Sequence, residues 1–210
     1  MALPFMDRTL IGVLTMVLLC PLYFIMHWKN EYCHASAAHM NGKTILPDIM
    51  HNMVGHHAAY SMIANLLTAG VILCFIVTMI ALQRWDDLLI YALLFVVSIY
   101  IKTLYAIATI LPDSNHGKCH YSKSLFETIT KMGSCNDLNL SGHCIAVLIA
   151  LYMLSKLTGH RYWFAYLVLA LAAFFFICAS RNHYTIDCIN SVAKSFILIV
   201  VYEWLVRARR

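Results

Sequence analysis

The sequence predicts an all-α polytopic membrane protein with six transmembrane helices. Of its 210 residues, 61% are hydrophobic and only 12% are charged, and the mean hydropathy is +0.72. A soluble domain could not bury this much apolar side chain, so the bilayer must act as the solvent. Because no Pro-, Gly- or Ser-rich tract offers a linker, we expect a single membrane domain over residues 1–210.

Six apolar stretches reach or approach the roughly 20 residues that a spanning helix needs. The first has no basic leading region and no small-residue cleavage site, which favours a retained span over a secretory signal. The second and third stretches are separated by a tight turn, and so are the fourth and fifth stretches. The fourth stretch is short, and the sixth carries polar residues. The predicted spans are residues 9–27, 59–82, 87–111, 142–157, 162–180 and 185–206.

The connections between these spans indicate the topology. Residues 28–58 and 112–141 form long polar loops, whereas residues 83–86 and 158–161 form tight turns. Arginines gather at the two termini and in the short turns, and the long loops carry only scattered lysines. By the positive-inside bias, both termini are expected in the cytoplasm and the long loops in an organelle lumen or outside the cell.

Several classes of function are disfavoured by the composition. The net charge is +5, but the basic residues form no stripe, so we expect no nucleic-acid partner. Seven loop histidines fit no common ligand spacing and are accompanied by no cysteine pair, so we expect no metal site and no cofactor. We interpret these histidines as loop residues: His34, His39, His51, His56, His57, His116 and His120.

Two polar motifs lie where the predicted spans meet the extracytoplasmic side. Residues 135–143 lead into the fourth span, with Ser141 as its expected N-cap and His143 in the first turn. Residues 182–187 lead into the sixth span, where the four-residue separation predicts His183 and Asp187 on one helical face. A lone histidine there would be an ordinary interfacial residue. Two histidines and a carboxylate at matched depth indicate a site, because ionisable groups near the membrane are costly unless they are used.

These motifs resemble those of a known family. CNDLNLSGH and HYTID are similar to the Cys-Gly-Asp-x3-Ser-Gly-His and His-Tyr-Thr-x-Asp elements of sphingomyelin synthases and inositol-phosphorylceramide synthases, in the type 2 phosphatidic acid phosphatase superfamily. Asn136 replaces the glycine. Leu46-Pro47-Asp48 resembles the Pro-Leu-Pro-Asp element. The segment from Lys102 to Pro112 resembles an Arg-containing element, with lysine in place of arginine.

The resemblance implies an enzyme, a lipid phosphotransferase. It would move phosphocholine, phosphoethanolamine or phosphoinositol from a glycerophospholipid to ceramide and release diacylglycerol. His183 would form a phosphohistidine, Asp187 would orient it, and His143 would act first as acid and then as base. The remaining residues expected to bind phosphate or substrate are Arg181, Ser141, Gly142, Lys102, Tyr184 and Asp48. The membrane would be that of the Golgi, the endoplasmic reticulum or the cell surface, with a lumenal or extracellular site.

Two other functions remain open from the sequence. A lipid phosphate phosphatase would use the same histidines and let water accept the phosphoryl group, and a transporter would use polar residues as a substrate pathway. Lys102 could also be a snorkelling lysine. Cys119 and Cys135 could form a disulfide in an oxidising lumen. The sequon at Asn139 adjoins the site, so we expect it to be unmodified.

Overall fold

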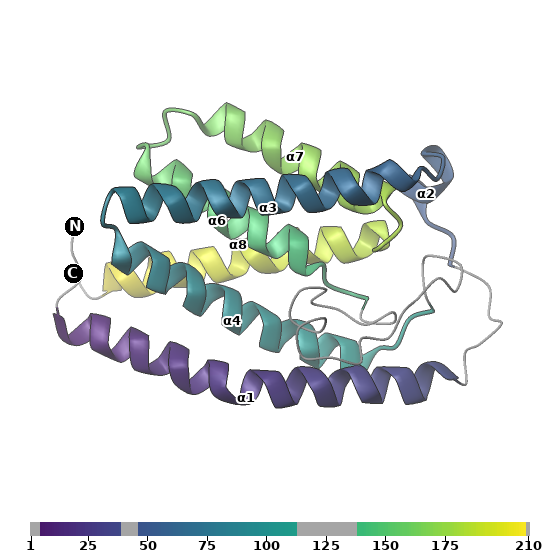
Figure 1. Ribbon diagram of the computed structural model, residues 1–210, viewed down its shortest axis with the longest axis horizontal. Coiled ribbons are helices and arrows are strands. Elements are labelled where there is room, and N and C mark those ends of the chain that lie inside the picture. Colours follow the sequence, from purple (N-terminus) through teal and green to yellow (C-terminus); the bar gives the residue numbers. More distant parts are fainter. Residues whose placement is uncertain (1–4, 39–45, 113–137, 209–210) are drawn as a thin grey trace.

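The computed structural model describes residues 5–38, 46–112 and 138–208, and within these ranges the chain is helical, without a β-strand (Figure 1). The predicted all-α fold is therefore confirmed for this part of the chain. Its helices are α1 (Phe5–Ala38), α2 (Ile49–Met53), α3 (Ala58–Ala81), α4 (Trp85–Ala108), α6 (Gly142–Leu157), α7 (Trp163–Ala179) and α8 (Thr185–Ala208).

Four of these helices are long and apolar enough to cross a membrane, namely α1, α3, α4 and α8. Helices α6 and α7 are apolar but shorter, with 16 and 17 residues. Large hydrophobic side chains point outward from α7 and α8, among them Phe164, Leu171 and Phe196. An apolar outer surface on several helices is typical of a membrane protein. Crossing by α6 and α7, and hence the count of six spans, stays a prediction.

The first predicted span is wrong at its C-terminal boundary. We predicted a polar loop from residue 28, whereas α1 continues to Ala38. Lys29 and Cys33 in this extension are buried, and the Cys33 thiol donates to the carbonyl of Ala106 in α4 at 3.8 Å. The extension is therefore held by packing against α4. A second, smaller correction concerns α4, which ends at Ala108 and not at residue 111.

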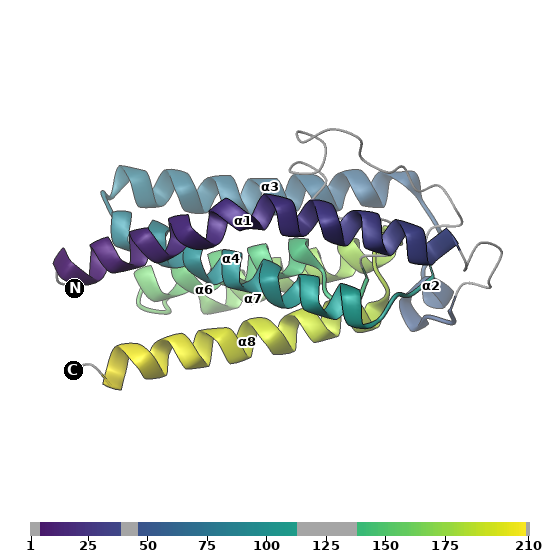
Figure 2. The same cartoon turned by 90° about the horizontal axis from the view of Figure 1, so that it is seen from below.

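Helix α6 lies at the centre of the bundle. It packs against α3, α4, α7 and α8, and most of its residues are buried. Helix α1 lies on the outside along α4 (Figure 2), where the Tyr100 hydroxyl donates to the carbonyl of Leu18 at 2.6 Å. A helix that is apolar on all sides is expected in such a central position.

The two ends of the bundle differ in kind. The start of α1, the end of α8 and the two tight turns gather at one end, and α2 with the start of α8 lies at the other (Figure 1). This arrangement agrees with the predicted grouping of the termini with the short turns. The described parts of the two motifs, residues 138–143 and 182–187, lie together toward the opposite end.

Candidate active site

The N-terminus of α6 is fixed to α8 by a chain of hydrogen bonds. Ser141 is completely buried, and its hydroxyl accepts from the backbone N–H of Cys144 at 3.3 Å, which confirms the predicted N-cap. The backbone N–H of Ser141 donates to the Ser191 hydroxyl at 2.6 Å, and that hydroxyl donates to the carbonyl of Asp187 at 2.7 Å. The two motifs, about 40 residues apart in sequence, are therefore joined directly.

His183 does not lie on α8, so the prediction that His183 and Asp187 share a helical face is wrong. The helix begins at Thr185, and His183 is in the bend that precedes it. The two side chains nevertheless meet, because His183 Nδ1 lies 3.5 Å from Asp187 Oδ2. This distance suits a charge interaction but exceeds that of a normal N–H···O hydrogen bond.

Asp187 shapes the backbone of both motifs. Its side chain has no exposed surface. One carboxylate oxygen accepts from the backbone N–H of Asn139 at 2.8 Å, and the other accepts from the backbone N–H of Tyr184 at 2.9 Å. A buried carboxylate needs such donors to offset its lost hydration. Asp187 therefore holds the two histidine-bearing segments together in addition to facing His183.

Both segments pass through the left-handed region of backbone conformation close to the histidines. The φ angles are 84° at Asn139 and 58° at Arg181. Positive φ is uncommon for non-glycine residues and is most readily adopted by asparagine and aspartate. The Asn139 side-chain amide also donates to the carbonyl of Thr109 at 2.8 Å. That contact ties the sequon asparagine to the end of α4.

Lys102 brings a buried positive charge to the start of α6. Its side chain is only 3% exposed, and a Cβ added to Gly142 would lie 3.8 Å from its ammonium nitrogen. Gly142 directly precedes His143, so the Lys102 ammonium lies close to the first turn of the helix that carries this histidine. The helix dipole also favours an anion at this N-terminal end.

Arg181 and Tyr184 contact other parts of the protein. The Arg181 guanidinium donates to the carbonyl of His51 at 3.0 Å. The Tyr184 hydroxyl accepts from the backbone N–H of Leu46 at 3.3 Å and donates to the carbonyl of Pro112 at 3.1 Å. These contacts join the bend before α8 to both long connections. They support a positioning role for the two side chains beside the substrate-binding role predicted for them.

Asp48 is likewise engaged by protein groups. Its carboxylate accepts from the backbone N–H and the hydroxyl of Thr185 at 2.6 and 2.7 Å, and from the backbone N–H of His51 at 3.1 Å. Burial by itself would raise the pKa of Asp48, but these hydrogen bonds together with the nearby His51 hold it below its usual value of 3.8. Asp48 therefore caps α2 and holds the first residue of α8.

His51 is a residue of this site that the sequence analysis missed, because it was assigned to the loop. Its ring is buried, and Nε2 donates to the carbonyl of His183 at 3.1 Å. The signal in the sequence was the spacing Asp48-x-x-His51, in which a capping aspartate at the start of a helix binds the backbone N–H three residues later. Cys119 and Cys135 lie outside the described residues, as does the predicted disulfide between them.

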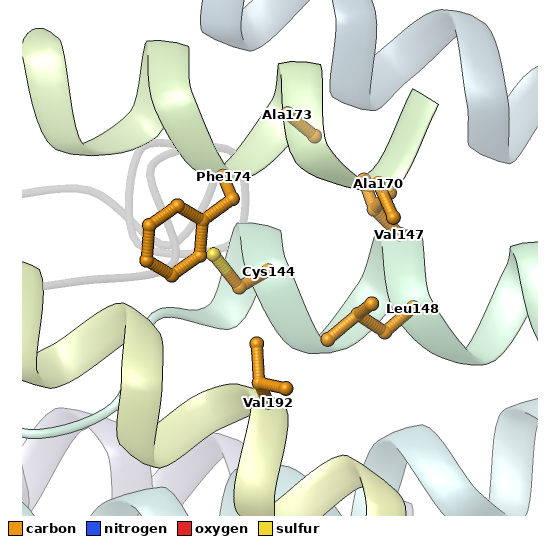
Figure 3. Close-up of a pocket in the computed structure, with 7 residues that line it drawn as sticks. All are labelled: Cys144, Val147, Leu148, Ala170, Ala173, Phe174 and Val192. Carbon is orange, nitrogen blue, oxygen red and sulfur yellow. The ribbon is translucent and has the colours of Figure 1, made fainter. Parts of the chain in front are cut away.

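A small apolar hollow, with a cavity volume of about 10 Å³, lies between α6, α7 and α8 beside Cys144, the residue after His143 (Figure 3). Cys144 stands at one end, and Phe174 and Val192 face it from the two neighbouring helices. Val192 is 42% exposed, so the hollow reaches the outer surface of the bundle. Its lining residues are Cys144, Val147, Leu148, Ala170, Ala173, Phe174 and Val192.

Residues 134–204 match the family model of the PAP2 superfamily C-terminal region. The match covers about one third of the chain and includes α6, α7, most of α8 and the residues His143, His183 and Asp187. No curated protein matches the chain. The similarity supports a relation to the type 2 phosphatidic acid phosphatase superfamily and suggests activity of the phosphatase or phosphotransferase kind on lipids.

Proposed function

We propose that this protein is a membrane phosphotransferase that moves a phospho-headgroup from a glycerophospholipid to ceramide through a phosphohistidine at His183, and releases diacylglycerol. The observation that carries the proposal is that Asp187 joins the segments that bear His143 and His183 and also faces His183 at 3.5 Å, while the Lys102 ammonium lies beside Gly142 at the start of α6. The family similarity of residues 134–204 supports phosphoryl chemistry at this place.

In the first step the nitrogen of His183 that faces away from Asp187 attacks phosphorus. Because Nδ1 lies toward the carboxylate, Nε2 is the attacking atom. The N–P bond forms as the bond from phosphorus to the diacylglycerol oxygen breaks, and His143 gives its proton to the departing alkoxide. Asp187 stabilises the positive charge that develops on the ring.

In the second step a hydroxyl group attacks the phosphohistidine. His143, now neutral, takes the proton from the primary alcohol of ceramide as the new O–P bond forms and the N–P bond breaks. In both steps, negative charge on the phosphoryl oxygens is stabilised by Lys102 and by the backbone N–H groups at the start of α6. His143 thus acts as acid in one half of the reaction and as base in the other.

The apolar outer surface beside the site supports a lipid as the substrate. Directly after His183 in sequence, α8 carries exposed hydrophobic side chains, among them Ile186, Ile189 and Val192. An exposed apolar face next to the site suits a substrate that approaches from the bilayer.

The proposed orientation places both termini in the cytoplasm and the site on the lumenal or extracellular side of a Golgi, endoplasmic reticulum or cell-surface membrane. The density of arginines at the termini and tight turns supports it. Protease treatment of sealed, right-side-out vesicles should leave a tag at either terminus intact. Digestion of one tag alone would mean an odd number of spans.

The direct test uses purified protein in vesicles with a phospholipid labelled in its headgroup. Label should appear in a sphingophospholipid only when ceramide is added, with diacylglycerol as the second product. His143→Ala and His183→Ala should both abolish transfer. His160→Ala is the matched control, because His160 is exposed and lies in the turn between α6 and α7, at the far end of the bundle.

The second candidate function is a lipid phosphate phosphatase, which the same pair of histidines and the superfamily match favour equally. Here water would attack the phosphohistidine. The two functions differ in the fate of the label. Release of water-soluble phosphate as the main product at saturating ceramide, together with rapid dephosphorylation of phosphatidic acid, would replace the transferase proposal with this one.

A further inference from the structure

The segment around α2 is hydrogen-bonded to the bend that carries His183 through three pairs of residues. His51 Nε2 donates to the carbonyl of His183 at 3.1 Å, and the Arg181 guanidinium donates to the carbonyl of His51 at 3.0 Å. Asp48 binds both the backbone N–H and the hydroxyl of Thr185. These contacts join residues that are 130 to 137 positions apart in sequence. They engage the Arg181 side chain, the His183 carbonyl and Thr185.

The contact from His51 is the one made to His183 itself. A carbonyl oxygen can only accept a hydrogen bond, so His51 Nε2 must carry a proton. The His51 side chain is 5% exposed, and its ring packs against Tyr184 with 5.7 Å between ring centroids. Because its Nε2 is engaged and its ring is enclosed, His51 is placed to hold the backbone and not to exchange protons with a substrate.

We infer that His51 is a positioning residue for the nucleophile, a role that rests on the proposed phosphotransfer function. By fixing the carbonyl of His183, it sets the direction of the Cα–Cβ bond and keeps Nδ1 toward Asp187 and Nε2 toward phosphorus. Angular placement of this kind matters because an error of about 1 Å at a reacting atom can cost about 100-fold in rate. The first long connection thereby becomes part of the active site.

Three substitutions at one position test the inference. Glutamine carries its amide nitrogen as many bonds from Cα as histidine carries Nε2, whereas asparagine reproduces only the position of Nδ1. His51→Gln should therefore keep kcat within about threefold of the original protein, and His51→Asn and His51→Leu should lower kcat by about tenfold or more with little change in KM. His56→Leu, at an exposed histidine, is the control.

A second readout does not depend on turnover. Hydrogen exchange of a peptide covering residues 180–186 should be faster in His51→Asn and His51→Leu than in the original protein, and unchanged in His51→Gln. Equal behaviour of the three variants in both measurements would overturn the inference, as would an equal loss of thermal stability in the glutamine and leucine variants, which indicates a packing role alone. If the protein acts on no lipid, the proposed function fails, while the exchange pattern still decides whether His51 holds this bend.

Discussion

Replacing Asp187 by asparagine should destabilise the protein as well as inactivate it. The carboxylate accepts two backbone N–H groups at 2.8 and 2.9 Å from a fully buried position. An asparagine can accept only one of them, and its NH₂ group then opposes the other. One charge-assisted hydrogen bond is lost, and one buried backbone N–H is left without an acceptor. Together these changes cost about 3 kcal/mol. For a chain of this size, that corresponds to a fall in Tm of roughly 10 °C.

The assay is thermal unfolding in detergent, with lipid transfer measured on the same samples. His183→Gln is the matched comparison, because its side chain is similar in size and the 3.5 Å approach of the histidine ring to Asp187 is too long for a normal hydrogen bond. It should lose activity with a much smaller change in Tm. If the Asp187→Asn protein had the same Tm as the original protein, the structural role of the Asp187 carboxylate would be refuted. An equal fall in both variants would show that the ring, and not the two N–H bonds, accounts for the stability.

Three further predictions concern the surroundings of the site. Lys102→Met should lower kcat/KM by about 100-fold, because the ammonium that stabilises phosphoryl charge is lost, while a Lys102→Arg protein should recover part of the rate. The stability that the Asp48 carboxylate supplies should be present above pH 3.8 and lost as the pH falls through its lowered pKa. In Asp48→Asn, the free energy of unfolding should therefore fall less steeply with decreasing pH below 3.8. Ala170→Phe, whose ring is far larger than the small hollow between α6, α7 and α8, should lower the free energy of unfolding by about 1–3 kcal/mol, measured as a fall in Tm, whereas Leu171→Phe on the outer surface should not.

The positions of the six longer helices could be predicted because each contains an apolar run bounded by polar residues, whereas the five-residue helix α2 falls within a predicted loop. The end of α1 could not, since hydropathy reports where a helix leaves the bilayer and not where it stops. Residues 28–38 mix polar and apolar side chains and form no apolar run, yet the Cys33 thiol and the buried Lys29 hold this stretch beside α4. Only the contact with α4, about 70 residues away, decides the boundary.

The residues of the candidate site could be identified from the two motifs, but their relative geometry could not. The four-residue spacing of His183 and Asp187 suggested a shared helical face, whereas the bend before α8 brings them together by another route. The hydrogen bonds of Asp48 and His51 join segments more than 130 residues apart. A local pattern contains no information about such pairs, so the anchoring of the nucleophile emerges only from the folded chain.

Because α6 is short, the rate of the proposed reaction should depend on the thickness of the surrounding membrane. Sixteen residues rise about 24 Å, less than the roughly 30 Å of a typical hydrocarbon core, and α6 begins short of the ends of α3 and α8 (Figure 1). Under the proposed topology, in which α6 crosses the membrane with its other end at the opposite interface, His143 would lie several ångströms below the level of the lipid headgroups. A headgroup would then reach it only where the bilayer thins or the lipid sinks. Thin membranes make that descent easier, so turnover should decline as the host lipids lengthen.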